Sequence, residues 1–445
     1  MILVVVASGD FFSDYGGGQV YVHNLVDELV HRQNVCESND NTPHNETIAT
    51  NVISFNKNGN VKISDYKGIN VYQVNDEGSF RKAVVQIQPD IVHANGEKLL
   101  TARLCKELNI PCIVTAHHGG LVCPAGTLLN TSDEICSIPA DYSHCLKCYL
   151  RNTPTGLFWY PLLKKYSQKH YCRIGERLEK LPTVPFLTPI GRTGQIVTKK
   201  LNDWKELATT ANHLIAPSDA IAEAMKRNGC PSSKITVIPH GIPLLYSQDN
   251  PPDNPPDNPQ LAAHLSQPIK FYYVGRINYN KGIHILLKAF ASINNPLIEL
   301  HLIGGAANTA EEHYEKKLKR TYRKDVRIIW HGKVHHEQLE KLTTNFHCLI
   351  HPAIYLEVFG LNISEALAKH KYVISTRCGG AEMQIHNEDD GTLVEANDVL
   401  SLKKAIEQYI NRPRQSSAVV NNIDEHIIQL IKLYASVIKR TSNYA

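Results

Sequence analysis

The sequence predicts an α/β protein in which two Rossmann-like domains face each other across a cleft. Short apolar runs rich in Val and Ile alternate with amphipathic segments over nearly the whole chain, as expected for βαβ units in parallel sheets. The length of 445 residues exceeds what a single hydrophobic core usually organises. A glycine-rich turn joins the first apolar run to a helical pattern, as at the ligand-binding edge of such sheets.

The first half of the chain contains three clear strand patterns, at 2–8, 90–94 and 112–117. The segment after the glycine-rich turn follows the i, i+3, i+4, i+7 spacing of a helix with one apolar face. Its apolar positions are Val22, Leu25, Val26, Leu29 and Val30. We expect a first domain over 1–210, with a cysteine-rich insertion at 121–150.

The second half contains seven strand patterns, at 213–218, 235–241, 269–276, 298–305, 326–332, 347–352 and 372–376. They predict a second domain over 211–415, and an amphipathic segment predicts a closing helix within 416–445. The repeat "DNPPDNPPDNP" at 249–259 cannot form a helix or a central strand, so we interpret it as a surface loop.

Composition excludes several classes of protein. The net charge of +4 is too small to indicate nucleic-acid binding, and no apolar run reaches the length of a membrane span. The apolar start lacks a basic signal-peptide region and is expected to be a buried strand. Eleven cysteines without a secretory signal favour reduced thiols and a cytoplasmic location.

The stretch "SDYGGGQVYVHNL" can bind an anion. Gly17 and Gly18 lie between a strand and a helix, where the backbone can approach a ligand and the helix N-terminus favours negative charge. The spacing is not GxGxxG, which argues against a nicotinamide site. A tight turn without a ligand is the alternative.

The stretch "YVGRINYNKGIHILLKAF" places two cations between a strand and a helix. Arg276 and Lys281 follow Gly275, and Gly282 keeps the turn open. Cations at this edge of a sheet suit phosphate groups. Two solvated loop cations are the alternative.

The stretch "EVFGLNISE" separates two glutamates by eight positions. We expect Glu357 in a loop and Glu365 inside the following helix, with the N–H groups of Phe359, Gly360 and Leu361 at the helix start. Each carboxylate can accept hydrogen bonds from vicinal hydroxyls of a sugar or ribose. The alternative is an exposed loop acid and an acid favoured by the helix dipole.

These stretches, with "STRCGGAEMQ" at 375–384, resemble the retaining glycosyltransferases of family 4, which have the GT-B fold. The most specific elements are the Glu-x7-Glu motif and, in register with it, the Gly-Arg…Lys-Gly loop. The resemblance implies an enzyme that moves a sugar from a nucleotide-sugar to a hydroxyl, in polysaccharide, glycolipid or glycoconjugate biosynthesis. A nucleotide-sugar 2-epimerase and a non-catalytic sugar-nucleotide-binding module are the alternatives.

The resemblance also implies roles for single residues. Arg276 and Lys281 would hold the donor diphosphate, Glu365 the ribose and Glu357 the donor sugar, and catalysis would need no metal. His117 in "VTAHHGG", or else the adjacent His118, would contact the donor sugar or the acceptor. A UDP-sugar is the expected donor, with a GDP-sugar second. The chain departs from the family at His240, where relatives usually carry Asn.

Four cysteines with His144 beside them can form a metal site. Cys123, Cys136, Cys145 and Cys148 combine one C-x2-C pair with two further thiols inside the insertion. This set suits a structural zinc that would fix the insertion without taking part in catalysis. Free thiols are the alternative.

Lys and Arg outnumber acidic residues between 147 and 205, and aromatic residues lie among them. Such a surface can rest on anionic lipid headgroups, which would suit peripheral membrane contact and a lipid-linked acceptor. A solvated basic surface is the alternative.

Overall fold

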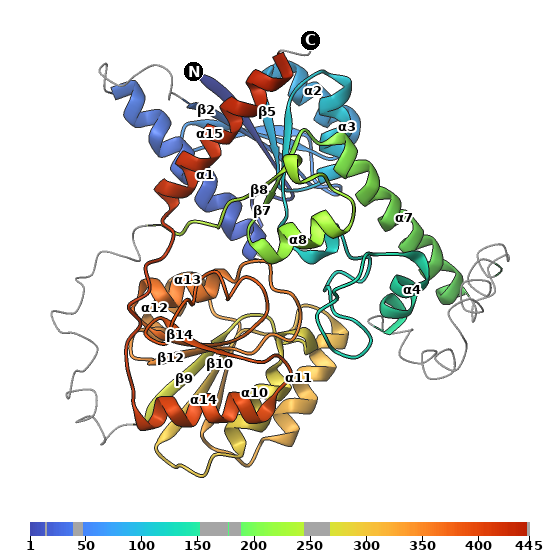
Figure 1. The fold of residues 1–445 in the computed structure, drawn as a ribbon. Helices are drawn as coiled ribbons and strands as arrows, with labels where there is room; N and C mark the ends of the chain where they lie inside the picture. Colours follow the sequence, from blue (N-terminus) through green and yellow to red (C-terminus); the bar gives the residue numbers. More distant parts are fainter. Residues whose placement is uncertain (14–15, 39–47, 152–176, 178–187, 244–267, 443–445) are drawn as a thin grey trace.

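The computed structural model describes residues 1–13, 16–38, 48–151, 177, 188–243 and 268–442 (Figure 1). The proline-rich repeat at 249–259 and most of the basic, aromatic segment at 147–205 lie outside these residues. The described residues form two parallel-sheet α/β domains, each with helices on both faces of its sheet (Figure 1). The predicted fold class is confirmed.

The sheet of the first domain has eight strands in the order β3-β4-β2-β1-β5-β6-β7-β8. Only the pairing of β3 with β4 is antiparallel among these strands. The strands are β1 (Ile2–Ser8), β2 (Ile48–Phe55), β3 (Lys62–Tyr66), β4 (Ile69–Val74), β5 (Ile91–Ala94), β6 (Cys112–Thr115), β7 (His213–Ala216) and β8 (Ile235–Val237).

Helices cover both faces of this sheet. The first-domain helices are α1 (Gly17–Ser38), α2 (Glu77–Ile87), α3 (Lys98–Glu107), α4 (Tyr142–Arg151), α7 (Thr188–Thr210) and α8 (Asp219–Arg227), with short 3-10 turns at Gly119–Leu121 and Ser232–Lys234. Helices α2, α3, α7 and α8 contribute to the core on one face, and α1 contributes to the core on the other. The predicted apolar stripe of α1 is fully buried there.

The sheet of the second domain has six parallel strands in the order β11-β10-β9-β12-β13-β14. The strands are β9 (Ile269–Val274), β10 (Ile298–Ile303), β11 (Ile328–Gly332), β12 (Cys348–His351), β13 (Tyr372–Thr376) and β14 (Gly391–Val394). The helices are α10 (Ile283–Ala291), α11 (Thr309–Thr321), α12 (His336–Thr343), α13 (Leu361–Ala368) and α14 (Val399–Asn411), with a 3-10 turn at Tyr279–Lys281. Helices α10, α11 and α14 share one core, and α12 and α13 share the core on the opposite face.

The predicted boundary at residue 210 is wrong. Strands β7 and β8 pair with β6 and extend the first sheet, so the first domain continues at least to Val237. The error has a physical reason: buried parallel strands have the same apolar, β-branched composition in either sheet, and composition does not specify their partners.

The predicted closing helix forms as α15 (Ile423–Ser442) and returns to the first domain. Ile427, Leu430 and Tyr434 are fully buried in the core that α15 shares with α1. Figure 1 shows α15 in red crossing beside α1. The chain therefore crosses between the domains twice, so movement of one domain against the other involves both crossings.

Within the described residues, none of the helices combines the length and the apolar character that crossing a bilayer requires.

Candidate active site

Lys281 and Glu357 form an ion pair at the carboxyl ends of β9 and β12. Their side chains are only 20% and 13% exposed. Asn278 caps the short turn that carries Lys281 by accepting a hydrogen bond from the Lys281 N–H at 3.0 Å. The two predicted motifs are thus brought into direct contact.

Gly282 allows the loop of Lys281 to approach the segment after β12. Its φ is +68°, and a β-carbon added there would lie 1.8 Å from the carbonyl oxygen of Pro352. The Ile354 N–H also donates to the carbonyl of Asn280 at 2.9 Å. Backbone contact therefore fixes where Lys281 lies relative to the glutamate loop.

Both members of the pair are charged. Burial would raise the pKa of Glu357, but the Lys281 ammonium and His351 outweigh it and hold the pKa well below its usual range. Burial would lower the pKa of Lys281, but the carboxylate raises it well above its usual value. The Tyr355 hydroxyl donates to Glu357 Oε2 at 2.8 Å. His351 Nε2 lies 3.5 Å from the same oxygen, a distance that indicates an electrostatic contact and no good hydrogen bond.

Arg276 has a separate counterion. Its Nη2 lies 2.5 Å from Glu311 Oε1 in the first turn of α11, and its side chain is 56% exposed while that of Glu311 is 13% exposed. The structure thus places Arg276 and Lys281 on one loop but directs them to different carboxylates. Arg276 is the accessible cation of the two, and it can turn toward a phosphate by leaving Glu311.

The start of α13 presents backbone N–H groups beside Glu357. Gly360 precedes the helix with φ +85°. The N–H groups of Phe359, Gly360 and Leu361 donate no hydrogen bond in the turns, loops and helix caps of the described residues. Helix-start N–H groups have no partner within the helix, so this end can bind an anion.

The loop 377–384 holds this stretch from behind. The Glu357 N–H donates to the Cys378 carbonyl at 2.7 Å, and the Gly380 N–H donates to the Glu357 carbonyl at 3.0 Å. Gln384 Nε2 donates to the Phe359 carbonyl at 2.6 Å. The "STRCGGAEMQ" stretch therefore supports the backbone of the glutamate motif.

Glu365 lies on α13 in a different pocket from Glu357. It lines a small hollow together with Tyr272, Asn362 and Lys369. Burial raises the pKa of Glu365 to about 7, and Lys369 opposes that rise. The two glutamates are therefore in distinct environments, one fully charged and one that titrates near neutral pH.

The glycine-rich turn of the first domain faces this site. A β-carbon added to Gly17 would lie 3.8 Å from Leu361 Cδ1 at the start of α13. A β-carbon added to Gly18 would lie 3.3 Å from His117 Cβ. The structure thus brings Gly17, Gly18, His117 and Leu361 together across the domain boundary.

His117 is held in one tautomer. Its Nε2 lies 2.7 Å from Asn95 Oδ1, which can only accept, so Nε2 carries the proton. Burial and the nearby Lys98 ammonium keep the pKa of His117 well below its usual value. Its Nδ1 is a buried acceptor without a partner among the described residues. His118, the predicted alternative, is exposed and lies beside Gly120.

A ring cluster that the sequence did not indicate joins the two domains. His240 lies 4.1 Å from Tyr21 and 5.3 Å from Phe359 between ring centroids. The Tyr21 hydroxyl lies 3.0 Å from His426 Nε2 on α15. His240 therefore packs between α1 and the loop that precedes α13, where the sequence had shown only a departure from the family.

Three further residues of the site were also missed. Tyr355 and His351 contact Glu357, and Asn362 Nδ2 donates to the Val274 carbonyl at 3.0 Å. Tyr355 was detectable because residues two apart in an extended segment share a side. Nothing in the sequence indicated His351 or Asn362, because their roles depend on the packing of β12 against β9.

The four cysteines predicted to bind zinc are free thiols in the described part of the insertion. Cys123, Cys145 and Cys148 are buried, and Cys148 Sγ lies 3.8 Å from His144 Nε2. Burial raises the pKa of Cys136, and it raises that of Cys145 to about 12 and that of Cys148 to about 11. Among the described residues, no three His, Cys, Asp or Glu side chains are arranged to hold a metal ion. The structural zinc stays a prediction without geometric support.

The insertion does contact the second domain. Leu129 is buried in the core of that domain. The Tyr279 hydroxyl donates to Asp133 Oδ2 at 3.1 Å, and Arg151 Nη2 lies 2.6 Å from the same carboxylate oxygen. Because Tyr279 is two residues before Lys281, the insertion packs against the loop that carries this cation.

The chain is similar to known glycosyltransferases in part of its sequence and in its overall fold. Residues 257–426 match the family model described as "Glycosyl transferases group 1", which covers most of the second domain. The chain is also similar over its full length to the structure of Anabaena HepE in complex with UDP, at 15% identity and a TM-score of 0.59, covering 100% of this chain and 99% of that one. The likeness confirms the two-domain GT-B arrangement.

Two sequence relatives have more specific names. The phosphatidylinositol N-acetylglucosaminyltransferase gpi3 subunit of Schizosaccharomyces pombe is 26% identical over 190 residues, which are 42% of this chain and 38% of the relative. The GDP-Man:Man(3)GlcNAc(2)-PP-Dol alpha-1,2-mannosyltransferase of Caenorhabditis elegans is 27% identical over 154 residues, which are 33% of this chain and 32% of the relative. The matches thus span about a third of the length of each relative.

Proposed function

We propose that the protein is a retaining glycosyltransferase that moves a sugar from a nucleoside-diphosphate sugar to a hydroxyl acceptor. One observation carries the proposal: a lysine, a carboxylate and an open helix N-terminus meet at the carboxyl ends of β9 and β12, opposite the glycine-rich turn of the first domain. In parallel α/β sheets, ligands bind outside the carboxyl ends of the strands. The family match of residues 257–426 supports the same class.

The diphosphate would lie between the loop of Lys281 and the start of α13. The leaving nucleoside diphosphate gains negative charge as the glycosidic bond breaks, so Lys281, Arg276 and the N–H groups of Phe359, Gly360 and Leu361 would stabilise it. These groups can neutralise the charge without a metal.

The glutamates would bind hydroxyl groups at the two ends of the donor. Glu357 is charged and already oriented by Lys281 and Tyr355, so its free lone pairs suit the hydroxyls of the donor sugar. Glu365, in its separate pocket, suits the ribose diol. His117 presents an unprotonated Nδ1 that can accept a hydrogen bond from a sugar hydroxyl.

Uridine is the base we favour, with guanosine second. The similar Anabaena protein has been solved with UDP and with UDP-glucose, whereas the similar nematode protein is named for GDP-mannose. A lipid-linked or polysaccharide acceptor, a cytoplasmic location and peripheral membrane contact stay predictions.

A donor panel tests the proposal. UDP-, GDP- and ADP-sugars are each incubated with the protein, and release of free nucleoside diphosphate is measured with and without hydroxyl acceptors. We expect slow release from one donor alone and faster release with an acceptor. Conversion of the donor to its 2-epimer, without release, would instead support the epimerase. A protein that neither binds nor turns over any donor would contradict both activities.

A further inference from the structure

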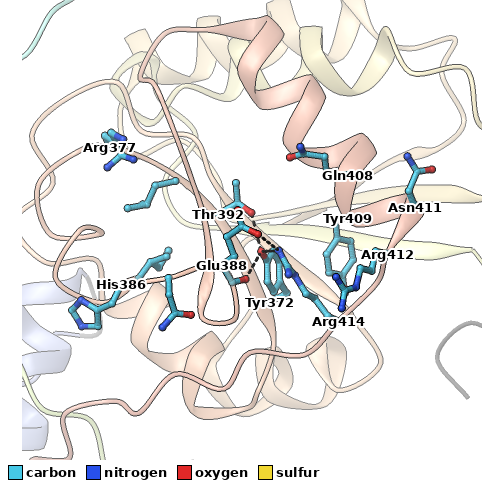
Figure 2. A pocket seen from close by; sticks show the side chains of 14 residues that line it. Tyr372, Arg377, His386, Glu388, Thr392, Gln408, Tyr409, Asn411, Arg412 and Arg414 are labelled. Atoms are coloured by element: carbon cyan, nitrogen blue, oxygen red, sulfur yellow. Dashed lines mark hydrogen bonds and ion pairs between the residues drawn. The ribbon is translucent and has the colours of Figure 1, made fainter. Parts of the chain in front are cut away.

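A second pocket, of about 540 Å³, lies along the outer strand β14 of the second sheet (Figure 2). Its walls come from β13, β14, the turn 385–388 and the end of α14. None of the predicted donor-site residues lines it. Its volume falls within the range of about 300–1,000 Å³ typical of small-molecule sites.

The floor of this pocket is aromatic and buried. The rings of Tyr372 and Tyr409 stack with centroids 5.2 Å apart, and both side chains are buried. The Arg414 guanidinium lies 4.9 Å from the centroid of the Tyr372 ring, and its Nη2 donates to the Tyr372 hydroxyl at 2.8 Å. Figure 2 shows this contact at the centre of the pocket. Arg414 is therefore held in place before any ligand arrives.

The lining is cationic. It contains Arg377, Arg412 and Arg414 and one carboxylate, that of Glu388. Arg377 Nε also lies 3.3 Å from Glu395 Oε1, and the Glu395 side chain is 73% exposed. Arg414 lies 3.9 Å from Glu388 and 3.9 Å from Asp389, whose side chains are 90% and 67% exposed. Exposed carboxylates at this distance can turn to solvent, while Arg414 itself is only 19% exposed. Its remaining guanidinium donors can then engage an anion.

Amide groups complete the lining. Asn387, Gln408 and Asn411 supply both donors and acceptors around the cations. Guanidinium groups bind phosphate through paired N–H donors, and side-chain amides bind hydroxyls. We propose that this pocket binds a small hydroxylated phosphate ester, such as a sugar phosphate, at a site separate from the donor site.

Titration calorimetry with glucose 6-phosphate tests the proposal. Inorganic phosphate and glucose are titrated separately to probe the phosphate group and the sugar of this ligand. The donor site is first saturated with UDP, and the titration is repeated without UDP. The double variant Arg377→Ala/Arg412→Ala removes two cations of the lining, and Lys404→Ala removes an exposed cation of α14 outside it. Thermal unfolding of each variant confirms that it is folded.

We expect saturable binding of glucose 6-phosphate with or without UDP, weakened at least tenfold in the double variant and unchanged within twofold in Lys404→Ala. Phosphate and glucose should each bind at least tenfold more weakly. Lack of binding, equal binding in the double variant, or equally tight binding of phosphate alone would overturn the proposal. Because the titration without UDP does not depend on the donor site, a failed donor assignment leaves the test intact.

Discussion

The ammonium of Lys281 and the carboxylate of Glu357 are ion-paired although 76 positions separate them in the sequence, and both are mostly buried. The pair links the loop after β9 to the loop after β12. It therefore contributes both to the folded state and to the proposed donor site, and these two contributions can be separated by mutation.

Lys281→Ala should lower both stability and turnover. Removing one partner leaves a buried carboxylate uncompensated, which costs about 3–5 kcal/mol. Loss of a cation where charge develops costs about 10²–10³ in rate. Chemical denaturation and donor turnover measure the two effects.

The double variant Lys281→Met/Glu357→Leu serves as the control. It removes both charges while keeping similar volume, so we expect it to recover most of the stability but none of the turnover. Recovery of turnover with stability would mean that the pair has only a structural role.

Glu365 should make donor binding depend on pH. Burial raises the pKa of its carboxyl to about 7. The group is therefore mostly ionised, and able to accept hydrogen bonds from a diol through both oxygens, only above neutral pH. We expect the affinity for UDP-glucose, whose diphosphate does not titrate in this range, to increase from pH 6 to pH 8. Glu365→Gln should remove that increase. An identical pH dependence in the variant would show that another group is responsible.

Gly282→Ala should be far more damaging than Gly332→Ala. Both glycines have positive φ, +68° and +73°, so both substitutions carry backbone strain of about 1–2 kcal/mol. A β-carbon at Gly282 would also collide with the Pro352 carbonyl, whereas none of the atoms described lies within 4 Å at Gly332. We expect Gly282→Ala to lower the free energy of unfolding by at least about 3 kcal/mol. We also expect Gly282→Ala, unlike Gly332→Ala, to abolish donor binding. Thermal unfolding and UDP titration are measured for both glycine variants. Equal losses of stability and of UDP affinity in the two variants would contradict the close packing of the Lys281 loop against Pro352.

His240→Phe should reduce acid sensitivity. Burial holds the pKa of His240 well below its usual value. Below about pH 6.5 the imidazole is therefore protonated in the unfolded chain but stays neutral in the folded protein. Stability therefore falls as the pH drops through that region. Phenylalanine keeps a ring between Tyr21 and Phe359 but cannot titrate. The slope of the unfolding free energy against pH should therefore decrease by an amount equivalent to at most one bound proton. Exposed His31→Phe is the control, and an unchanged slope in His240→Phe would contradict the assignment.

A ligand in the arginine-lined pocket should tighten donor binding. Arg377 directly precedes Cys378 and lies three positions before Gly380, and the backbones of Cys378 and Gly380 hold that of Glu357. Saturating glucose 6-phosphate should therefore lower the Kd of UDP about fivefold or more, and UDP should have the reciprocal effect. Gln384→Ala, which removes the hydrogen bond to the Phe359 carbonyl, should weaken this coupling. Unchanged UDP affinity would show that the two sites are independent.

Local patterns predicted the fold class, and together with the family resemblance they predicted the residues of the candidate donor site. Glycine, cation and glutamate spacings mark loops at strand ends, and strands in parallel sheets end at a common edge. Partners across the sheets could not be predicted, because an apolar strand such as β7 does not specify which sheet it joins. Strands β2 to β4 escaped detection because polar residues such as Thr50, Asn51 and Ser54 interrupt or border their apolar runs. The pairing of Arg276 with Glu311 was equally hidden, since it depends on where α11 begins.

Direct titration of UDP into the wild type and into the variant Lys281→Met/Glu357→Leu tests the proposed donor site most directly. We expect saturable binding to the wild type and at least a tenfold loss of affinity in the folded double variant. Equal affinity in both proteins, or no binding of UDP, GDP or ADP to the wild type, would contradict the donor site proposed between Lys281, Glu357 and the start of α13.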